Sequence, residues 1–202
     1  MKAFIDLYIK RLDKPSILKH LGFTTVVVEE YEKRVDNVNG LRIVRGTLLS
    51  ATRLGELKEK LRGIKEKYPI VLVDPLSVEV ARFAAHDGRV DGILLDGENI
   101  KIVDKAQINM MRQYSKPLII SLREYLSLPD QYKSMIYRRI KLAIDRGVTI
   151  IPVSGATSYK EYIVPSTMVY LLSFLFDTDY KYWIYTLSSA PREILVRNGV
   201  AP

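Results

Sequence analysis

Short apolar runs recur along this chain at intervals of about 25 residues. They are Ala3–Ile9, Thr24–Glu29, Leu41–Leu49, Ile70–Asp74, Gly92–Asp96, Leu118–Leu122, Thr149–Val153 and Trp183–Leu187. Several are almost continuous Val, Ile and Leu, which is typical of strands buried on both faces. Stretches with helical spacing lie between most of them. Eight such units predict an α/β protein, a small (β/α)8 TIM-like barrel, and the same alternation also fits a doubly wound open sheet.

Residues that begin and end helices fall where this alternation needs them. Ser77 and Asp104 precede helical segments as N-caps would, and Gly147 follows the long helix expected over Tyr132–Arg146. The span Tyr31–Gly40 is the weakest helix, because its second half reads as a turn. Without a linker or low-complexity stretch, residues 1–202 are predicted to form a single barrel domain.

Composition removes several classes of chemistry. The 202 residues contain no cysteine and two histidines, which excludes disulfides, thiolate nucleophiles and cysteine zinc sites. His20 and His86 each fall at a helix end, where a cation favours the helix dipole, so both are interpreted as capping residues. No signal peptide or membrane span is evident, and the apolar stretch Ile163–Phe176 is too short to cross a bilayer. A cytoplasmic, heat-adapted protein is expected.

Polar residues end several predicted strands, where barrels concentrate function. They are Asp6, Glu29, Asp74, Asp96, Arg123, Ser154 and Ser188. The carboxylates fit either Mg²⁺ ligands or ordinary helix and turn caps. The small residues Ser154, Gly155, Ala156 and Thr157, and likewise Ser188 and Ser189, allow backbone N–H groups to approach a phosphate, although tight turns prefer the same residue types. Nucleotide-cofactor motifs are absent.

Positive charge has a candidate location. The chain carries 31 Lys and Arg against 23 Asp and Glu, a formal net charge of +8. One predicted helix brings together Lys133, Arg138, Arg139, Lys141 and Arg146, with tyrosines interleaved. Such spacing suits contacts to successive phosphates, and it also suits a solvated amphipathic helix. Lys160, Arg192 and Arg197 are predicted to extend this basic patch.

The second part of the chain resembles a known family. Its motifs follow one another in the order found in protein component 3 of archaeal ribonuclease P. They are Ser121-Leu122-Arg123, the basic helix, Val153–Ala156, an apolar helix that begins at Pro165, and Ser189-Ala190-Pro191 with Arg197. The resemblance covers Ser121 to Arg197. It implies a (β/α)8 barrel and an RNA-binding role for Arg123, Arg138, Lys141 and Arg197.

The resemblance implies that the chain is a subunit of a ribonucleoprotein enzyme. Ribonuclease P is an endonuclease that removes the 5′ leader of precursor tRNA, and its RNA subunit holds the catalytic site and Mg²⁺. The chain is then expected to have no catalytic residue, metal or cofactor of its own. Its expected partners are the ribonuclease P RNA, precursor tRNA, a small RRM-like protein subunit and the other holoenzyme proteins, with no membrane.

Two other hypotheses stay open on the sequence. A stand-alone barrel enzyme would hold a phosphorylated small molecule in the two small-residue loops, with a carboxylate such as Asp74 or Asp96 as base. A purely structural barrel would bind a protein partner and no RNA. The sequence leaves undecided whether Asp6, Asp74 or Asp96 has a chemical role.

Overall fold

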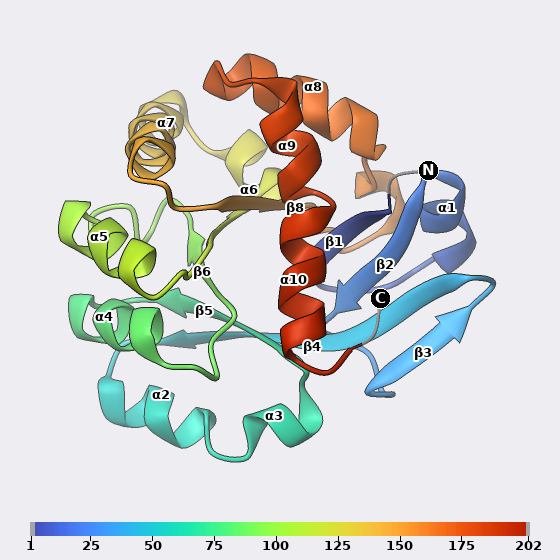
Figure 1. Ribbon diagram of the computed structural model, residues 1–202, viewed down its shortest axis with the longest axis horizontal. Helices are drawn as coiled ribbons and strands as arrows, with labels where there is room; N and C mark the ends of the chain where they lie inside the picture. The colour runs from blue at the N-terminus through green and yellow to red at the C-terminus, as the bar shows by residue number, and fades with distance from the viewer. Residues whose placement is uncertain (1–2, 201–202) are drawn as a thin grey trace.

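The computed structural model describes residues 3–200, and parallel strands form its centre (Figure 1). Neighbouring strands follow the order β1-β2-β4-β5-β6-β7-β8, and β3 pairs with β4 outside this path. The strands are β1 (Phe4–Ile9), β2 (Phe23–Val28), β3 (Val35–Val38), β4 (Leu41–Ala51), β5 (Ile70–Pro75), β6 (Gly92–Leu95), β7 (Leu118–Ser121) and β8 (Ile150–Val153). The barrel fold predicted from the sequence is confirmed.

Helices surround this sheet. They are α1 (Pro15–His20), α2 (Leu54–Lys60), α3 (Ile64–Lys67), α4 (Val78–His86), α5 (Lys105–Gln113), α6 (Leu122–Ser127), α7 (Asp130–Asp145), the short 3-10 turn η1 (Tyr159–Glu161), α8 (Pro165–Phe176), α9 (Tyr180–Thr186) and α10 (Ser189–Arg197). The predicted caps are confirmed: Ser77 Oγ accepts from Val80 N at 3.3 Å, and Asp104 Oδ1 accepts from Gln107 N at 2.7 Å. Within residues 3–200, no helix combines the length and apolar character needed to cross a bilayer.

The apolar core has two layers because successive side chains of a strand point to opposite faces. Residues such as Leu7, Val27 and Leu72 fill the barrel interior, while Val26, Val28 and Val73 pack outward against the helices. Helix α10 contributes Ala190, Ile194 and Leu195 to the interior cluster, so it closes one end of the barrel.

The prediction of an eighth strand at Trp183–Leu187 is wrong. These residues belong to α9 and the turn after it, and in Figure 1 the red α9 and α10 form a column between β8 and the blue strands. Trp183 and Leu187 are completely buried one helical turn apart, which places both on the inner face of a helix. The segment also satisfies strand-edge groups: Ile150 N donates to the Tyr182 hydroxyl at 2.9 Å, and Ile5 N donates to Leu187 O at 2.8 Å.

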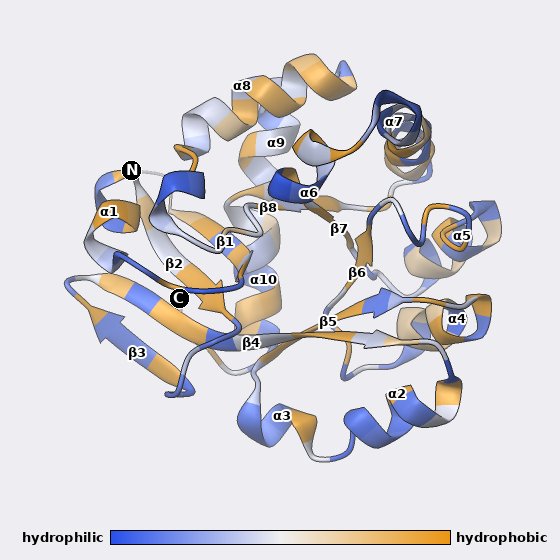
Figure 2. Cartoon of the chain, turned by 180° about the vertical axis from the view of Figure 1, so that it is seen from behind, coloured by the Kyte–Doolittle hydropathy of each residue, from blue (hydrophilic) through white to orange (hydrophobic). Residues whose placement is uncertain are grey.

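The helix expected over Tyr31–Gly40 is also absent from the structure. Instead β3 forms an antiparallel hairpin with β4, and Figure 2 shows β3 as largely hydrophilic. Asn39 and Gly40 both have positive φ, at 53° and 77°, as a tight two-residue hairpin turn requires. The turn expected in the second half of this span is therefore present, at Asn39 and Gly40, as the turn of an added hairpin.

Candidate nucleic-acid interface

Helix α7 places three of the predicted basic residues on its outer side. Its inner side buries Ile136, Ile140 and Ala143. Arg138, half a turn from Ile136 and Ile140, is exposed, whereas Lys133 and Lys141 are half-buried at the edges of the outer side. Lys133 and Arg138 line a shallow hollow of about 440 Å³ together with Tyr125, Ser134 and Tyr137. Lys141 follows one turn later and donates to Asp177 O at 3.1 Å.

These cations have little compensating negative charge. The Lys133 ammonium lies 3.7 Å from a fully exposed Asp130 carboxylate, a contact that solvent screens strongly. Among residues 3–200, no carboxylate forms an ion pair with Arg138 or Lys141. Tyr137 is stacked on Phe176, with ring centroids 6.3 Å apart, which holds this part of α7 against α8. The surface of Lys133, Tyr137, Arg138 and Lys141 is called the α7 outer face below.

Arg139 of α7 and Arg146, the residue directly after α7, point elsewhere. Arg139 Nη2 donates to Ile100 O at 3.4 Å. Arg146 Nη1 donates to Asn109 Oδ1 at 2.9 Å, beside Arg112 on the neighbouring α5. The five basic residues that the sequence places on one helix therefore lie on two different sides of it.

Arg123 and Lys160 lie near the carboxyl ends of the strands. Arg123 follows β7, the sixth strand of the parallel path, as predicted. Its Nε lies 3.0 Å from Glu161 Oε1, so part of its charge is neutralised. Lys160 is exposed in η1, next to this pair.

Arg192 and Arg197 do not extend the α7 outer face, which corrects the predicted single patch. Both lie on α10, at the end of the barrel where strands begin. Arg197 Nη2 is 3.4 Å from Asp91 Oδ1, and Asp91 directly precedes β6. The completely buried Asp91 also pairs with Lys65 and accepts from Asn198 Nδ2 at 2.8 Å.

The loop Ser154–Thr157 has its backbone N–H groups engaged inside the protein. Ser154 N donates to both carboxylate oxygens of Asp6 at 3.2 Å, and Gly155 N donates to Tyr8 O at 3.1 Å. Ala156 N donates to Ser154 Oγ at 3.3 Å, and Thr157 N donates to Glu161 Oε2 at 2.7 Å. These bonds join β8 to β1, and they leave no free donor in this stretch for a phosphate.

Asp6 is therefore an organiser of the barrel seam between β1 and β8. The carboxylate is completely buried, and burial raises its pKa to about 6 despite the hydrogen bonds from Ser154 and Tyr8.

Ser188 and Ser189 lie at the opposite end of the barrel from Ser154. They line a hollow with Ala3, which precedes β1. The prediction that the loops Ser154–Thr157 and Ser188–Ser189 together bind a phosphate is thus wrong. Ser188 and Ser189 were expected to end an eighth strand, but they follow helix α9.

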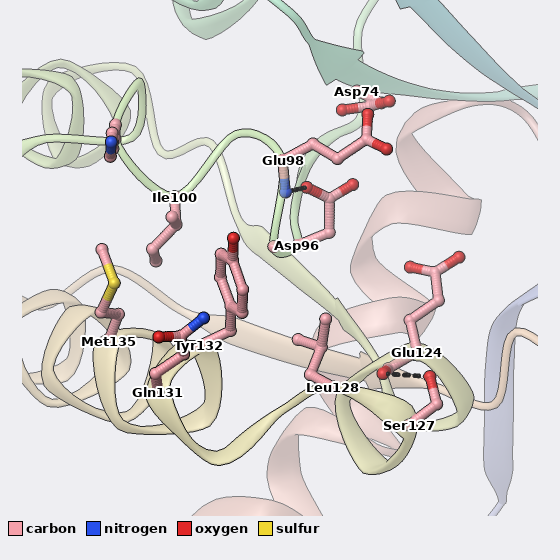
Figure 3. A pocket seen from close by; sticks show the side chains of 12 residues that line it. Asp74, Asp96, Glu98, Ile100, Glu124, Ser127, Leu128, Gln131, Tyr132 and Met135 are labelled. Carbon is pink, nitrogen blue, oxygen red and sulfur yellow. Dashed lines mark hydrogen bonds between the residues drawn. The ribbon is translucent and has the colours of Figure 1, made fainter.

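An acidic pocket of about 840 Å³ occupies the carboxyl-terminal end of the barrel (Figure 3). Asp74, Asp96, Glu98 and Glu124 line it together with Lys101, Leu128 and Tyr132. Asp74 accepts from Ser50 Oγ and Asn99 Nδ2, each at 3.0 Å. Burial, followed by the charge of Asp96, raises the pKa of Asp74.

Glu98 and Glu124 were not singled out in the sequence, and a signal for Glu124 was available. Glu124 follows Arg123 in the first turn of α6, directly after the end of β7. Neighbouring residues of a helix point in different directions, so Glu124 lines the pocket while Arg123 pairs with Glu161. Burial and the charges of Asp96 and Asp74 raise the pKa of Glu124. In the described part of the chain, no group of three His, Asp or Glu residues converges closely enough to hold a metal ion.

The two histidines act at helix ends, as predicted. His20 Nδ1 lies 2.8 Å from Ser16 O, and His86 Nδ1 lies 3.0 Å from Arg82 O, each within the last turn of its helix.

Comparison with solved structures finds the same fold in two kinds of protein. A chain in a cryo-EM structure of archaeal ribonuclease P with mature tRNA matches 96% of this chain and 90% of its own length, with a TM-score of 0.78 and 15% identity. A prolidase solved with N-methylphosphonate-L-proline matches 100% of this chain and 75% of its own, with a TM-score of 0.62 and 11% identity. An amidohydrolase matches 99% and 75%, with a TM-score of 0.59 and 12% identity. Neither a protein-family model nor a curated protein matches the sequence.

Proposed function

We propose that this chain is a protein subunit of ribonuclease P, an RNA-based endonuclease that removes the 5′ leader of precursor tRNA. The observation that carries the proposal is the structural similarity to a chain of archaeal ribonuclease P over 96% of this chain and 90% of that one. The hydrolase neighbours match over only 75% of their own lengths, so their chains have substantial parts without a counterpart here. The motif order from Ser121 to Arg197 supports the same family.

In this proposal the chain binds and supports RNA and has no active site of its own. The catalytic chemistry and Mg²⁺ belong to the RNA subunit, and a small RRM-like protein is the expected partner. The α7 outer face supplies phosphate contacts through Lys133, Arg138 and Lys141, and Tyr137 offers a ring edge and hydroxyl beside them. A rigid helix fixes the spacing of these cations, which suits recognition of a folded RNA by shape.

The acidic pocket disfavours the alternative of an enzyme for phosphorylated small molecules. Four carboxylates face that cavity against the single ammonium of Lys101, so a phosphate entering there meets like charge. The loop Ser154–Thr157 adds no free backbone donor to offset this repulsion.

Reconstitution tests the proposed function directly. Adding this chain to ribonuclease P RNA with its other protein subunits should increase precursor-tRNA cleavage at limiting Mg²⁺. Arg138→Ala with Lys141→Ala should reduce that gain and weaken RNA affinity about tenfold or more at low salt. Arg62→Ala is the matched control, because Arg62 is exposed and lies between α2 and α3, away from α7. Unchanged cleavage on adding the wild-type chain would refute the proposal.

A further inference from the structure

The geometry points to a second anion site, a phosphate-binding hollow at the end of the barrel where strands begin. The hollow has a volume of about 280 Å³, and its polar lining includes Thr25, Asn37, Arg42 and Arg192. None of its described lining residues is acidic. It lies apart from the α7 outer face, on β2, β3, β4 and α10.

Sheet register sets three of these side chains in one row. Arg42 of β4 is paired with Thr25 of β2 on one side and with Asn37 of β3 on the other. Residues directly opposite in neighbouring strands project to the same face of the sheet. Two residues further along, Val27 and Val44 are paired and belong to the barrel interior, so the row occupies the rim of that interior.

The row presents a hydrogen-bond donor that the protein itself does not use. Thr25 is only 4% exposed and lines the hollow. Asn37 Oδ1 accepts from Gly40 N at 3.0 Å, which leaves its NH₂ group as a donor for a ligand.

Two guanidinium groups provide the charge. Arg42 and Arg192 reach the hollow from the sheet and from α10, and no carboxylate of residues 3–200 forms an ion pair with either. Lys19 stands at the rim, where its Nζ donates to Gly40 O at 2.8 Å. An arginine fork with neighbouring hydroxyl and amide donors matches the tetrahedral oxygens of a phosphate.

A second hollow continues the site along α10. It has a volume of about 390 Å³, shares Arg192 with the first, and is lined by Lys181, Ser188 and Ser189. Cations from Arg42 through Arg192 to Lys181 thus form a short track. Such a track fits two linked phosphates, either in an RNA backbone or in a free diphosphate.

Titration of the full chain with inorganic pyrophosphate, followed by isothermal calorimetry, tests the hollow. Arg42→Gln and Arg192→Gln should each weaken binding about tenfold, because each removes a charge-assisted pair. Thr25→Val should weaken it less, since the hydroxyl is neutral. Arg62→Gln serves as the charge-matched control. Arg192 is exposed on a helix surface, so its variant stays informative even if Arg42→Gln impairs folding.

A labelled precursor tRNA distinguishes the two sources of phosphate. Weaker RNA binding by Arg42→Gln, with competition by pyrophosphate, would identify the RNA backbone as the ligand. Weaker pyrophosphate binding alone would identify a free diphosphate, and either result supports the hollow. Absent pyrophosphate binding, or equal loss in Arg62→Gln, would overturn it. Only the RNA arm rests on the proposed function, which fails separately if adding the wild-type chain leaves precursor-tRNA cleavage by reconstituted ribonuclease P unchanged.

Discussion

Three aspartates in this barrel show that the surroundings of a polar side chain determine its role. Asp6, Asp74 and Asp96 were all expected at strand ends, but only Asp74 and Asp96 lie there, because Asp6 lies inside β1. In the structure Asp6 accepts backbone hydrogen bonds from β1 and from the residue after β8, Asp74 is held by Ser50 and Asn99, and Asp96 accepts from Glu98 N at 2.8 Å. Each carboxylate accepts hydrogen bonds from neighbouring protein groups, so a position at a strand end does not by itself identify a catalytic group.

Asp6 should make stability depend on pH in an unusual direction. Burial raises its pKa from an ordinary 3.8 to about 6, so the folded state binds a proton more tightly than the unfolded state. Its contribution to stability is full below about pH 4 and is lost as pH rises through 6. The loss amounts to about 3 kcal/mol.

Urea unfolding at pH 4, 5, 6 and 7 measures this effect. Relative to Asp6→Asn, the wild-type free energy of unfolding should fall by that amount across the series. An equal pH dependence of wild type and variant would contradict the role given to Asp6.

At the scale of elements, the sequence predicted most of the barrel and misplaced two segments for physical reasons. The runs that became β1, β2 and β4 to β8 are dominated by β-branched and aliphatic residues, and their neighbours pair in parallel as expected. Trp183–Leu187 has similar residue types, but its buried residues recur at helical spacing. Tyr31–Gly40 was ambiguous because a hairpin turn and a helix end use the same small polar residues.

The candidate site was less predictable than the fold. Lys133, Arg138 and Lys141 share a face because helical spacing is readable in sequence. Arg192 and Arg197 were misplaced because their position depended on the eighth strand. The row of Thr25, Asn37 and Arg42 joins three strands, and its register depends on a hairpin that was read as a helix.

Helix α10 is attached to the barrel through Asp91, and Asp91→Ala should loosen it. The variant removes the buried partner of Lys65, Arg197 and Asn198, leaving charge without compensation. A loss of about 3–5 kcal/mol in unfolding free energy is expected. Hydrogen exchange of the α10 amides should accelerate more than that of β2, since Asp91 also accepts from Val71 N of β5 at 2.8 Å. Asp145→Ala, an exposed carboxylate at the end of α7, is the control; equal effects of both substitutions would contradict this attachment.

Across the whole molecule, charge is separated rather than spread. The α7 outer face and the hollow of Arg42 and Arg192 are basic, whereas the pocket at the carboxyl ends of the strands is acidic. An RNA that contacts this protein is therefore expected to avoid the acidic end. The net charge of +8 understates how strongly the two basic surfaces can act.

Independent basic surfaces should contribute additively to the salt dependence of RNA binding. Plots of log affinity against log salt concentration should lose about 0.7–0.9 in slope for each phosphate contact removed. Combining Arg138→Ala and Lys141→Ala with Arg42→Gln and Arg192→Gln should reduce the slope by the sum of the separate changes. Fluorescence anisotropy with precursor tRNA measures it. A combined change no larger than either alone would show that the surfaces do not both contact RNA.

The helical replacement of an eighth strand has a consequence for solubility. A sheet that does not pair fully around its circle leaves two borders whose N–H and C=O groups can template association with another copy. Here Tyr182 and Leu187 bond to such groups on Ile150 and Ile5. Helix α9 and the residue after it thus protect the sheet against self-assembly, and a chain in which this segment detaches would expose both borders together.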